Sequence, residues 1–440
     1  MTVDRAETAC ERAAVRAASS NLWNWACLLT GALAGGCGGS ATASDAGEAR
    51  SPDASADSHR ADAPDSGLHA AIPLVDYLGG PIIASPKVVT VTYGADADPG
   101  ADPKRAFAEA FDDAITSTPW WDDVRAGYCD NGTPRKCVGR GTSGGHVHLT
   151  DSPAAAYDDS PAGGSLRTLL QSYITSGLFP TPDSDTIYVV FFPRTSIITV
   201  DGYAVSCQQF GAYHASFEAA LPGGGRAVVP YVIVPRCSSN DGDLTASVSH
   251  ELIESATDPV DPDPAIGGNG YSMTTDTVWP VFGDGSEVAD LCIWANESEA
   301  YTEGSYAVVR SWSNLAAAGG HDPCVPAPAL ATRPYFNVAP SAERVSLRVG
   351  QATTVDLDAF SDGPMPDWTV AAEDVSPTYA GTANAATFAL DRTAVNDGTR
   401  LHLTIVMARA APEAHPMFLM LISTSGTTIH RWPIAVTTPE

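Results

Sequence analysis

The sequence predicts two folded units, an α/β domain with a central sheet and a C-terminal all-β sandwich. The first prediction rests on β-branched or aromatic runs that alternate with stretches of helical spacing. The second rests on short alternating segments, separated by turn residues, over roughly the last 100 residues. A chain of 440 residues is also longer than one ordinary domain of roughly 100 to 200 residues.

The chain begins with a segment of signal-peptide type. Arginines within residues 1–16 precede an apolar run from Leu22 to Gly36, and small residues come directly before Cys37. The run is shorter than the about 20 apolar residues of a membrane-spanning helix, so we expect residues 1–37 to be a lipoprotein signal with a lipid anchor at Cys37. Cleavage without a lipid is the alternative, because Leu33 stands one place too far upstream for the usual pattern. A start codon assigned too early would explain the mixed charge of this leader.

Residues 38–67 are rich in Ala, Ser, Asp and Pro and have almost no large apolar side chain. Such a segment buries too little surface to offset its ordering entropy, so we expect a disordered acidic tether. The whole chain has 52 Asp and Glu against 24 Lys and Arg, a formal net charge of −28. Phosphate backbones are repelled by such a surface, which argues against nucleic acid as a partner.

Residues 68–328 form the predicted α/β domain. Its expected strands are runs of buried-strand type, and its expected helices have helical spacing. The strands are Val88–Tyr93, Ile187–Phe192 and Val228–Val234, and the helices are Pro103–Ile115, Ser165–Ser176 and Asp243–Ala256. We expect these helices to pack on a central sheet, with loops rich in Gly and Pro forming one rim of a cleft.

Residues 333–440 form the predicted sandwich, which we expect to be of immunoglobulin-like type. Turn residues such as Ser361-Asp362-Gly363 separate its short segments. The expected strands are Val345–Val349, Thr353–Asp358, Thr387–Leu390, Leu401–Val406, Phe418–Ile422 and Ile434–Val436. This region contains no cysteine and no group of catalytic residue types, so we expect a supporting or binding role.

The cysteines divide by position into a leader group and an even set of six in the α/β domain. An even set in an exported chain indicates disulfides. The pairings favoured by nearness in sequence are Cys129 with Cys137, Cys207 with Cys237 and Cys292 with Cys324. Zinc binding by these thiols is the weaker interpretation, because no CxxC pair occurs.

The most informative stretch runs from Asp243 to Pro259 and reads DLTASVSHELIESATDP. Asp243 is a suitable N-cap of a helix, and Pro259 is expected to end it. His250 and Glu254 lie four residues apart, so their side chains share one helix face and can converge on one ion.

The residues His250-Glu251-Leu252-Ile253-Glu254 match the HExxH helix of zinc metalloproteases, with its second histidine replaced by Glu254. In that pattern the first and fifth residues bind zinc, and the glutamate beside the first histidine polarises the metal-bound water. The expected metal ligands are therefore His250 and Glu254, and the expected catalytic base is Glu251. On this evidence the α/β domain is metalloprotease-like.

A third ligand is expected from Glu287 or Asp290, which lie three residues apart on one helical turn. One of them would bind the ion and the other would orient a ligand, and the sequence leaves open which does which. The alternative is an exposed acidic turn without a metal.

His214, which follows Tyr213 and stands close after Cys207, is a further candidate for the site. It could steady an oxyanion during catalysis or complete a metal shell, and the alternative is a hydrogen-bonded structural histidine. We expect His146 and His148 to lie in an exposed loop outside the site.

Together these motifs resemble one family. A Tyr-His pair after a cysteine, the segment SHELIESATDP, a later Trp279 and the segment EVADLC are similar to those of bacterial relatives of the plant Exordium, or phosphate-induced, proteins. The resemblance covers approximately Val88 to Pro326 and leaves out the tether and the last domain. It implies an extracytoplasmic place and a zincin-like helix, and it supports the site more than a particular reaction.

Two functions follow from these expectations. The first is a secreted or lipid-anchored zinc-dependent endopeptidase that acts on a protein or peptide with metal-activated water. The second is a non-catalytic extracellular binding or cell-surface module with a structural metal, which binds a cell-wall polymer or another protein. Calcium is the alternative ion, because one histidine with two carboxylates is a harder ligand set than two histidines and a glutamate. An outer-membrane or cell-surface lipoprotein would touch the membrane only through Cys37, and a secreted form would not.

Overall fold

The computed structural model describes residues 71–93, 101–161, 163–260, 268–274, 277–282, 287–295, 301–328 and 333–439. The expected signal segment 1–37, the anchor at Cys37 and the tether 38–67 lie outside the described residues. Among the described helices, none is long and apolar enough to cross a membrane.

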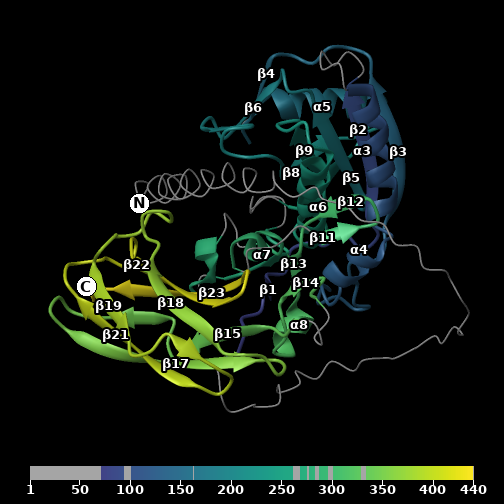
Figure 1. Ribbon diagram of the computed structural model, residues 1–440. Coiled ribbons are helices and arrows are strands. Elements are labelled where there is room, and N and C mark those ends of the chain that lie inside the picture. Colours follow the sequence, from purple (N-terminus) through teal and green to yellow (C-terminus); the bar gives the residue numbers. More distant parts are fainter. Residues whose placement is uncertain are drawn as a thin grey trace, which may run out of the picture.

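A five-stranded mixed sheet forms the centre of the first domain (Figure 1). Its strands, in spatial order, are β3 (Thr142–Leu149), β2 (Lys87–Tyr93), β5 (Thr186–Phe192), β9 (Arg226–Pro235) and β8 (Tyr213–Ala220). The first four run parallel, and β8 is antiparallel to β9. The three strands expected from β-branched and aromatic runs are thus the three central strands of this sheet.

Helices cover both faces of this sheet, and β5 illustrates why. Because successive side chains of a strand point to opposite faces, Ile187, Val189 and Phe191 join one core and Tyr188, Val190 and Phe192 join another. The first core contains side chains of α3 (Ala101–Ile115) and α6 (Asp241–Thr257), and the second contains those of α5 (Ser165–Thr175). Helices therefore lie on both faces of the sheet, and the metalloprotease-like type of this domain stays a prediction.

Smaller elements surround the sheet. The helices are α4 (Pro119–Val124), α7 (Asp290–Ala295), α8 (Asn314–Ala318) and η2 (Trp279–Phe282). The strand pairs are β1 (Asp76–Tyr77) with β10 (Tyr271–Ser272), β11 (Tyr301–Glu303) with β12 (Tyr306–Val308) and β13 (Ser311–Trp312) with β14 (Cys324–Val325). A small sheet consists of β4 (Ala156–Asp159), β6 (Ile197–Val200) and β7 (Ala204–Val205).

The expected disulfides Cys129–Cys137, Cys207–Cys237 and Cys292–Cys324 all form, so that prediction is confirmed. Such bonds persist in oxidising, extracytoplasmic compartments.

The C-terminal region consists of two sheets, and the predicted β-sandwich is confirmed. One sheet has the order β15 (Phe336–Pro340), β17 (Ala352–Ser361), β21 (Arg400–Met407) and β19 (Ala386–Leu390). The other has the order β16 (Arg344–Ser346), β23 (Thr428–Thr437), β22 (Met417–Ser425), β18 (Trp368–Asp374) and β20 (Ala394–Val395). All pairings are antiparallel except β16 with β23, and the immunoglobulin-like type stays a prediction.

The sandwich packs against the part of the first domain that precedes α7. The rings of Trp279 and Trp432 lie 5.3 Å apart between centroids, edge to face. Glu343 Oε1 accepts hydrogen bonds from Trp279 Nε1 at 3.0 Å and from Trp432 Nε1 at 2.7 Å. Strand β23 and the segment around η2 and α7 are therefore joined by a shared buried contact. The expected supporting or binding role of the sandwich stays a prediction.

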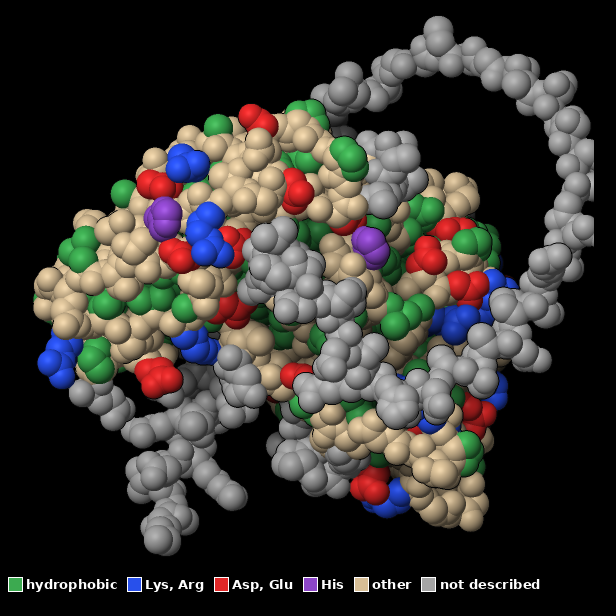
Figure 2. Space-filling model, turned by 90° about the horizontal axis from the view of Figure 1, so that it is seen from below, with side chains coloured by type: hydrophobic (Ala, Val, Ile, Leu, Met, Phe, Trp, Pro, Cys, Tyr) green, Lys and Arg blue, Asp and Glu red, His purple; other side chains and the backbone are tan. Residues whose placement is uncertain are grey.

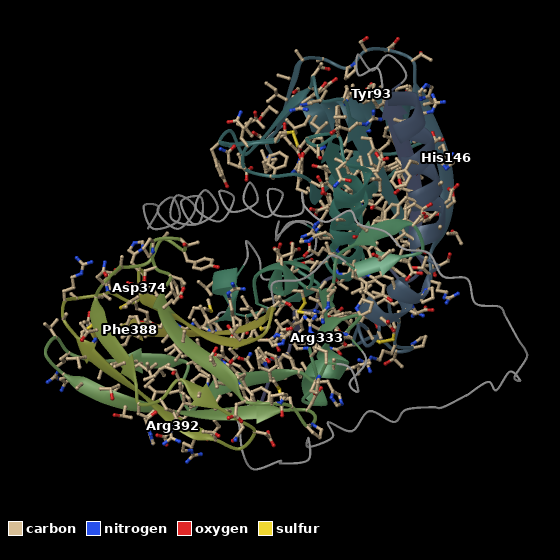
Figure 3. The ribbon with its side chains drawn as sticks, viewed as in Figure 1. Tyr93, His146, Arg333, Asp374, Phe388 and Arg392 are labelled. Atoms are coloured by element: carbon tan, nitrogen blue, oxygen red, sulfur yellow. A yellow bond between two sulfur atoms is a disulfide. The ribbon has the colours of Figure 1, made fainter. Side chains whose placement is uncertain are left out.

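The structure corrects several local expectations. Asn240, not Asp243, caps α6, because its side chain accepts a hydrogen bond from Gly242 N. His146 and His148 lie in edge strand β3, not in a loop, where His146 Nε2 contacts Asp113 Oδ1 at 2.9 Å (Figure 3). Strands β15, β18 and β20 of the sandwich were not expected, and neither were the outer strands β3 and β8 of the central sheet or the small strands around it.

Charged groups on the surface are intermixed. On the described part of the face in Figure 2, Lys and Arg side chains lie next to Asp and Glu side chains and do not gather in a continuous basic band. Arg400 with Asp358, at 2.7 Å between Nε and Oδ1, is a pair of this kind. Such exposed pairs contribute little to stability.

Candidate metal site

Helix α6 carries three of the expected site residues and is buried along most of its length. Val248, Leu252 and Ile253 are fully buried on the sheet side. Small polar residues allow a close approach on the other side, where Ser249 Oγ accepts a hydrogen bond from Val309 N at 3.0 Å. The helix ends at Thr257, two residues before Pro259, as a proline stop requires. His250, Glu251 and Glu254 are therefore held in the interior, with 5%, 7% and 1% of their surface exposed.

Glu254 is oriented by the backbone at the start of α7. Its Oε1 accepts hydrogen bonds from Ala289 N at 3.0 Å and from Asp290 N at 3.1 Å. These bonds leave Oε2 beside His250, 3.0 Å from its Nε2. A carboxylate fixed on one oxygen in this way presents the other oxygen in a single direction.

Asp290 completes a close group with these two residues. Its Oδ1 lies 3.3 Å from His250 Nε2. The turn that carries it is fixed by the disulfide of Cys292 with Cys324 and by the hydrogen bond from Trp312 N to Val288 O at 2.7 Å. Asp290 is the first residue of α7, whereas Glu287 precedes the helix.

His214 reaches the same place from β8. Its Nδ1 donates to Glu251 Oε2 at 3.2 Å and lies 3.8 Å from Glu254 Oε2. Its Nε2 lies 3.3 Å from Glu287 Oε1. His214 is therefore placed between two carboxylates, and its side chain is 9% exposed.

All six residues singled out in the sequence lie in one cluster, which we call the His/carboxylate cluster: His214, His250, Glu251, Glu254, Glu287 and Asp290. Within it, two sets of three have ligand atoms within 4.8 Å of one another, namely His214, Glu254 and Glu287, and His250, Glu254 and Asp290. Among the described residues, no Lys or Arg forms an ion pair with its four carboxylates. Four largely buried carboxylates with only two histidines as basic partners need further protons or cations to neutralise them.

The protonation of the cluster follows from this arrangement. Burial alone would lower the pKa of His214, but the charge of Glu287 and the contact with Glu251 outweigh it and hold the pKa well above its usual value. Burial alone would also lower the pKa of His250, but the negative charges of Glu254 and Glu251 outweigh it and raise this pKa. Burial raises the pKa of Glu287 to about 7, although the charge of His214 opposes the shift. The ion-free cluster therefore retains protons at neutral pH.

Comparison with known proteins gives no family. No family model matches the sequence, and no curated protein matches it. Among solved structures, a conjugative transposon lipoprotein from Bacteroides eggerthii is 10% identical over 22% of this chain and 95% of its own, with a TM-score of 0.17. The BIgI domain of the beta protein from S. agalactiae, solved bound to CEACAM1, is 12% identical over 24% of this chain and 96% of its own, with a TM-score of 0.16. Titin M4 is 14% identical over 24% and 95%, with a TM-score of 0.16. Similarities this weak support no statement about function.

Proposed function

We propose that this protein is an exported zinc-dependent endopeptidase, anchored by a lipid or secreted, in which His250, Glu254 and Asp290 bind the ion. The observation that supports it is the spacing around His250 Nε2, with Glu254 Oε2 at 3.0 Å and Asp290 Oδ1 at 3.3 Å. Ligand atoms about 2.0 to 2.2 Å from a tetrahedral zinc ion lie about 3.3 to 3.6 Å apart. The separation of His250 from Asp290 falls in this range, the separation from Glu254 is shorter, and all three ligand atoms lie within 4.8 Å of one another. The spacing also favours Asp290 over Glu287 as the third ligand.

The other three residues of the cluster would divide the remaining tasks of catalysis. Zinc, when bound, supplies a Lewis acid that acidifies water and polarises a carbonyl group. Glu251 follows the ligand His250 directly and would take a proton from the attacking water and pass it to the amine nitrogen that leaves, the task of the glutamate in the HExxH helix. His214, positively charged between Glu251 and Glu287, stabilises the negative oxygen that forms on the scissile carbonyl group. Glu287 orients His214 and holds its charge.

The test combines metal analysis with peptide hydrolysis by the purified full chain. We expect about one zinc ion per chain, cleavage of a mixed peptide library, and loss of that cleavage with a chelator. Glu251→Gln should retain the ion and lose about 100- to 10,000-fold in rate, because general base catalysis contributes that much. Glu413→Gln, a change of the same type at an exposed glutamate of the sandwich, is the matched control and should keep full activity. Undiminished cleavage by the Glu251→Gln variant would eliminate this base.

A non-catalytic surface module with a structural ion is the second candidate. The observation that favours it is burial, since His250 is only 5% exposed and Glu254 only 1%. An ion held this deeply stabilises a fold without meeting a substrate. In that case the sandwich would bind a cell-wall polymer or another protein, and calcium would be a second possible ion. Stoichiometric metal, a fall in Tm with chelator and no cleavage of any peptide would establish this function in place of the first.

A further inference from the structure

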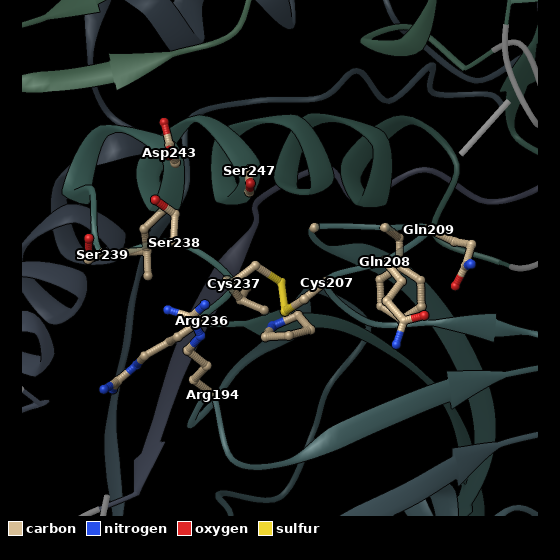
Figure 4. Close-up of a pocket in the computed structure, with 15 residues that line it drawn as sticks. Arg194, Cys207, Gln208, Gln209, Arg236, Cys237, Ser238, Ser239, Asp243 and Ser247 are labelled. Carbon is tan, nitrogen blue, oxygen red and sulfur yellow. A yellow bond between two sulfur atoms is a disulfide. The ribbon is translucent and has the colours of Figure 1, made fainter. Parts of the chain in front are cut away.

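A pocket of about 390 Å³ lies beside α6 (Figure 4). Its walls come from four places in the chain, namely Arg194, the segment 207–211, the segment 234–239 and the first turns of α6. The disulfide of Cys207 with Cys237 forms part of its lining and joins two of these segments. Its volume falls within the range of about 300 to 1,000 Å³ that is usual for ligand pockets.

The pocket adjoins the His/carboxylate cluster on two elements. Ser247 lines the pocket and Glu251 belongs to the cluster, and the two are four residues apart on α6. They therefore share a helix face, separated by about 6 Å along the axis. Gly211, also in the lining, is followed three residues later by His214. A peptide with its scissile bond at Glu251 and His214 would place a neighbouring residue in this pocket.

The charge of the lining is opposite to that of the cluster. Arg194 and Arg236 both line the pocket (Figure 4). Arg236 is 4% exposed, whereas Arg194 is exposed. The lining contains one acid, Asp243, whose Oδ1 accepts a hydrogen bond from Asn240 Nδ2 at 3.0 Å in the first turn of α6. In a chain with 24 basic and 52 acidic side chains, two arginines in one small pocket are a local reversal of charge.

We propose that this pocket binds a carboxylate of the substrate, next to the bond that the cluster cleaves. Guanidinium groups bind carboxylates through paired, charge-assisted hydrogen bonds, which makes arginine suited to this recognition. The serine and glutamine side chains of the lining can supply further hydrogen bonds to the same group. The inference rests on the proposed function for the peptide nature of the substrate. The carboxylate can come from an acidic side chain or from the C-terminus of a peptide, and these two sources differ in a simple experiment.

The experiment compares four peptides that differ at two places only. The residue near the cleaved bond is Glu or Gln, and the C-terminus is free or amidated. The value of kcat/KM is measured for the full chain, for Arg194→Gln and for Arg236→Gln. Arg226→Gln is the matched control, because Arg226 pairs with Glu218 at 2.8 Å and does not line the pocket. For the wild type and the control, we expect kcat/KM to be about tenfold higher for peptides that carry the recognised carboxylate than for peptides that lack it. In the two pocket variants this difference in kcat/KM should disappear.

The source is read from the peptide that is preferred. A preference for Glu regardless of the terminus assigns the side chain, and a preference for the free terminus regardless of Glu assigns the C-terminus. If Arg236→Gln does not fold, Arg194→Gln tests the proposal alone, and Arg194→Glu should transfer the preference to a peptide with Lys in place of Glu. Hydrolysis without any carboxylate preference in the wild type would overturn the inference and leave the peptidase intact.

The Glu251→Gln chain separates this inference from the proposed function. The Kd values of the same peptides are measured by fluorescence anisotropy, a readout that needs no hydrolysis. Tighter binding of a carboxylate-bearing peptide, lost in Arg194→Gln, supports the pocket even if no chain hydrolyses anything, whereas equal Kd values for all four peptides contradict it.

Discussion

The two domains bury histidine in opposite ways. In the first domain His214 and His250 lie among carboxylates, and their pKa values are raised. In the sandwich His430 is 2% exposed, with its ring centroid 4.8 Å from those of Tyr335 and Phe336. Burial, which the charge of Asp322 only partly offsets, lowers the pKa of His430 to about 4. Histidine thus pairs with carboxylates in one core and packs in its neutral form against aromatic rings in the other.

The difference supports the placement of the proposed site in the first domain. Burying charged groups is costly unless a partner offsets the cost, and a core selected for stability alone avoids it. The sandwich follows that rule, and its buried histidine has aromatic neighbours. The first domain departs from it at six residues that meet from β8, α6 and the turn before α7. Such departures are expected at functional sites.

The strongest test of the comparison removes one histidine from each core. We expect His250→Gln to weaken zinc binding at least about 100-fold, because loss of a ligand exceeds the about 10- to 100-fold effect of losing an outer partner. We expect His430→Gln to leave zinc affinity unchanged. The zinc Kd of each chain, measured by competition with a chelating dye, gives the answer. Equal effects of the two changes would remove the contrast between the cores.

A second test sharpens the roles of the two acids. We expect Asp290→Asn to weaken zinc binding at least about 100-fold and Glu287→Gln only about tenfold. The reason is that Asp290 Oδ1 lies 3.3 Å from His250 Nε2, whereas Glu287 Oε1 lies at the same distance from His214 Nε2. Competition with a chelating dye again measures the affinities. The reverse order would make Glu287 the ligand.

The pH dependence of the free energy of unfolding should show that His430 is buried in its neutral form in the sandwich. His430 has a folded-state pKa of about 4 and an unfolded value of about 6.5, so folding favours its neutral form. Stability is therefore complete above about pH 6.5 and falls by up to about 3 kcal/mol as the pH decreases toward 4. Urea unfolding between these pH values, followed by Trp fluorescence, measures the loss. His430→Leu should reduce the slope, and an unchanged slope would assign the loss to other groups.

The smallest expected effect concerns the contact between the domains. Glu343 Oε1 accepts hydrogen bonds from Trp279 and Trp432, so Glu343→Gln exchanges two charge-assisted bonds for neutral ones. We expect a loss of about 1 kcal/mol in stability and a small rise in zinc Kd, since this contact supports the segment before α7. Thermal unfolding and metal titration measure the two quantities. A change in stability with no change in zinc affinity would show that the sandwich does not support the site.

Local patterns in the sequence account for much of the fold. The runs at 88–93, 187–192 and 228–234 are central strands because β-branched and aromatic side chains fill both faces of a buried sheet. Strand β18 has no strand pattern in its second half, because Ala-Ala-Glu-Asp follows Val370 and contains no β-branched or aromatic residue. Strand β20 has only two residues, too few to form a pattern. The sequence pointed to Asp243 as the N-cap of α6, and the actual cap is Asn240, because both residue types are good N-caps.

The site was predictable where its pattern is local and not where it depends on contacts between distant segments. The pattern of His250, Glu251 and Glu254 is local, and the turn with Glu287 and Asp290 was recognisable beside it. The choice between those two acids depends on which one faces His250, a contact between segments about 40 residues apart that no spacing rule determines. The pocket with Arg194 and Arg236 comes from four segments and has no sequence signature at all.

A crystal structure of the zinc-loaded chain, with anomalous data collected at the zinc edge, tests the proposed ligand set. We expect one strong peak about 2.0 to 2.2 Å from His250 Nε2, Glu254 Oε2 and Asp290 Oδ1, with Glu251 beside the open coordination position. A cluster without a peak in zinc-loaded protein, or a peak that Asp290 and His250 do not share, would contradict it.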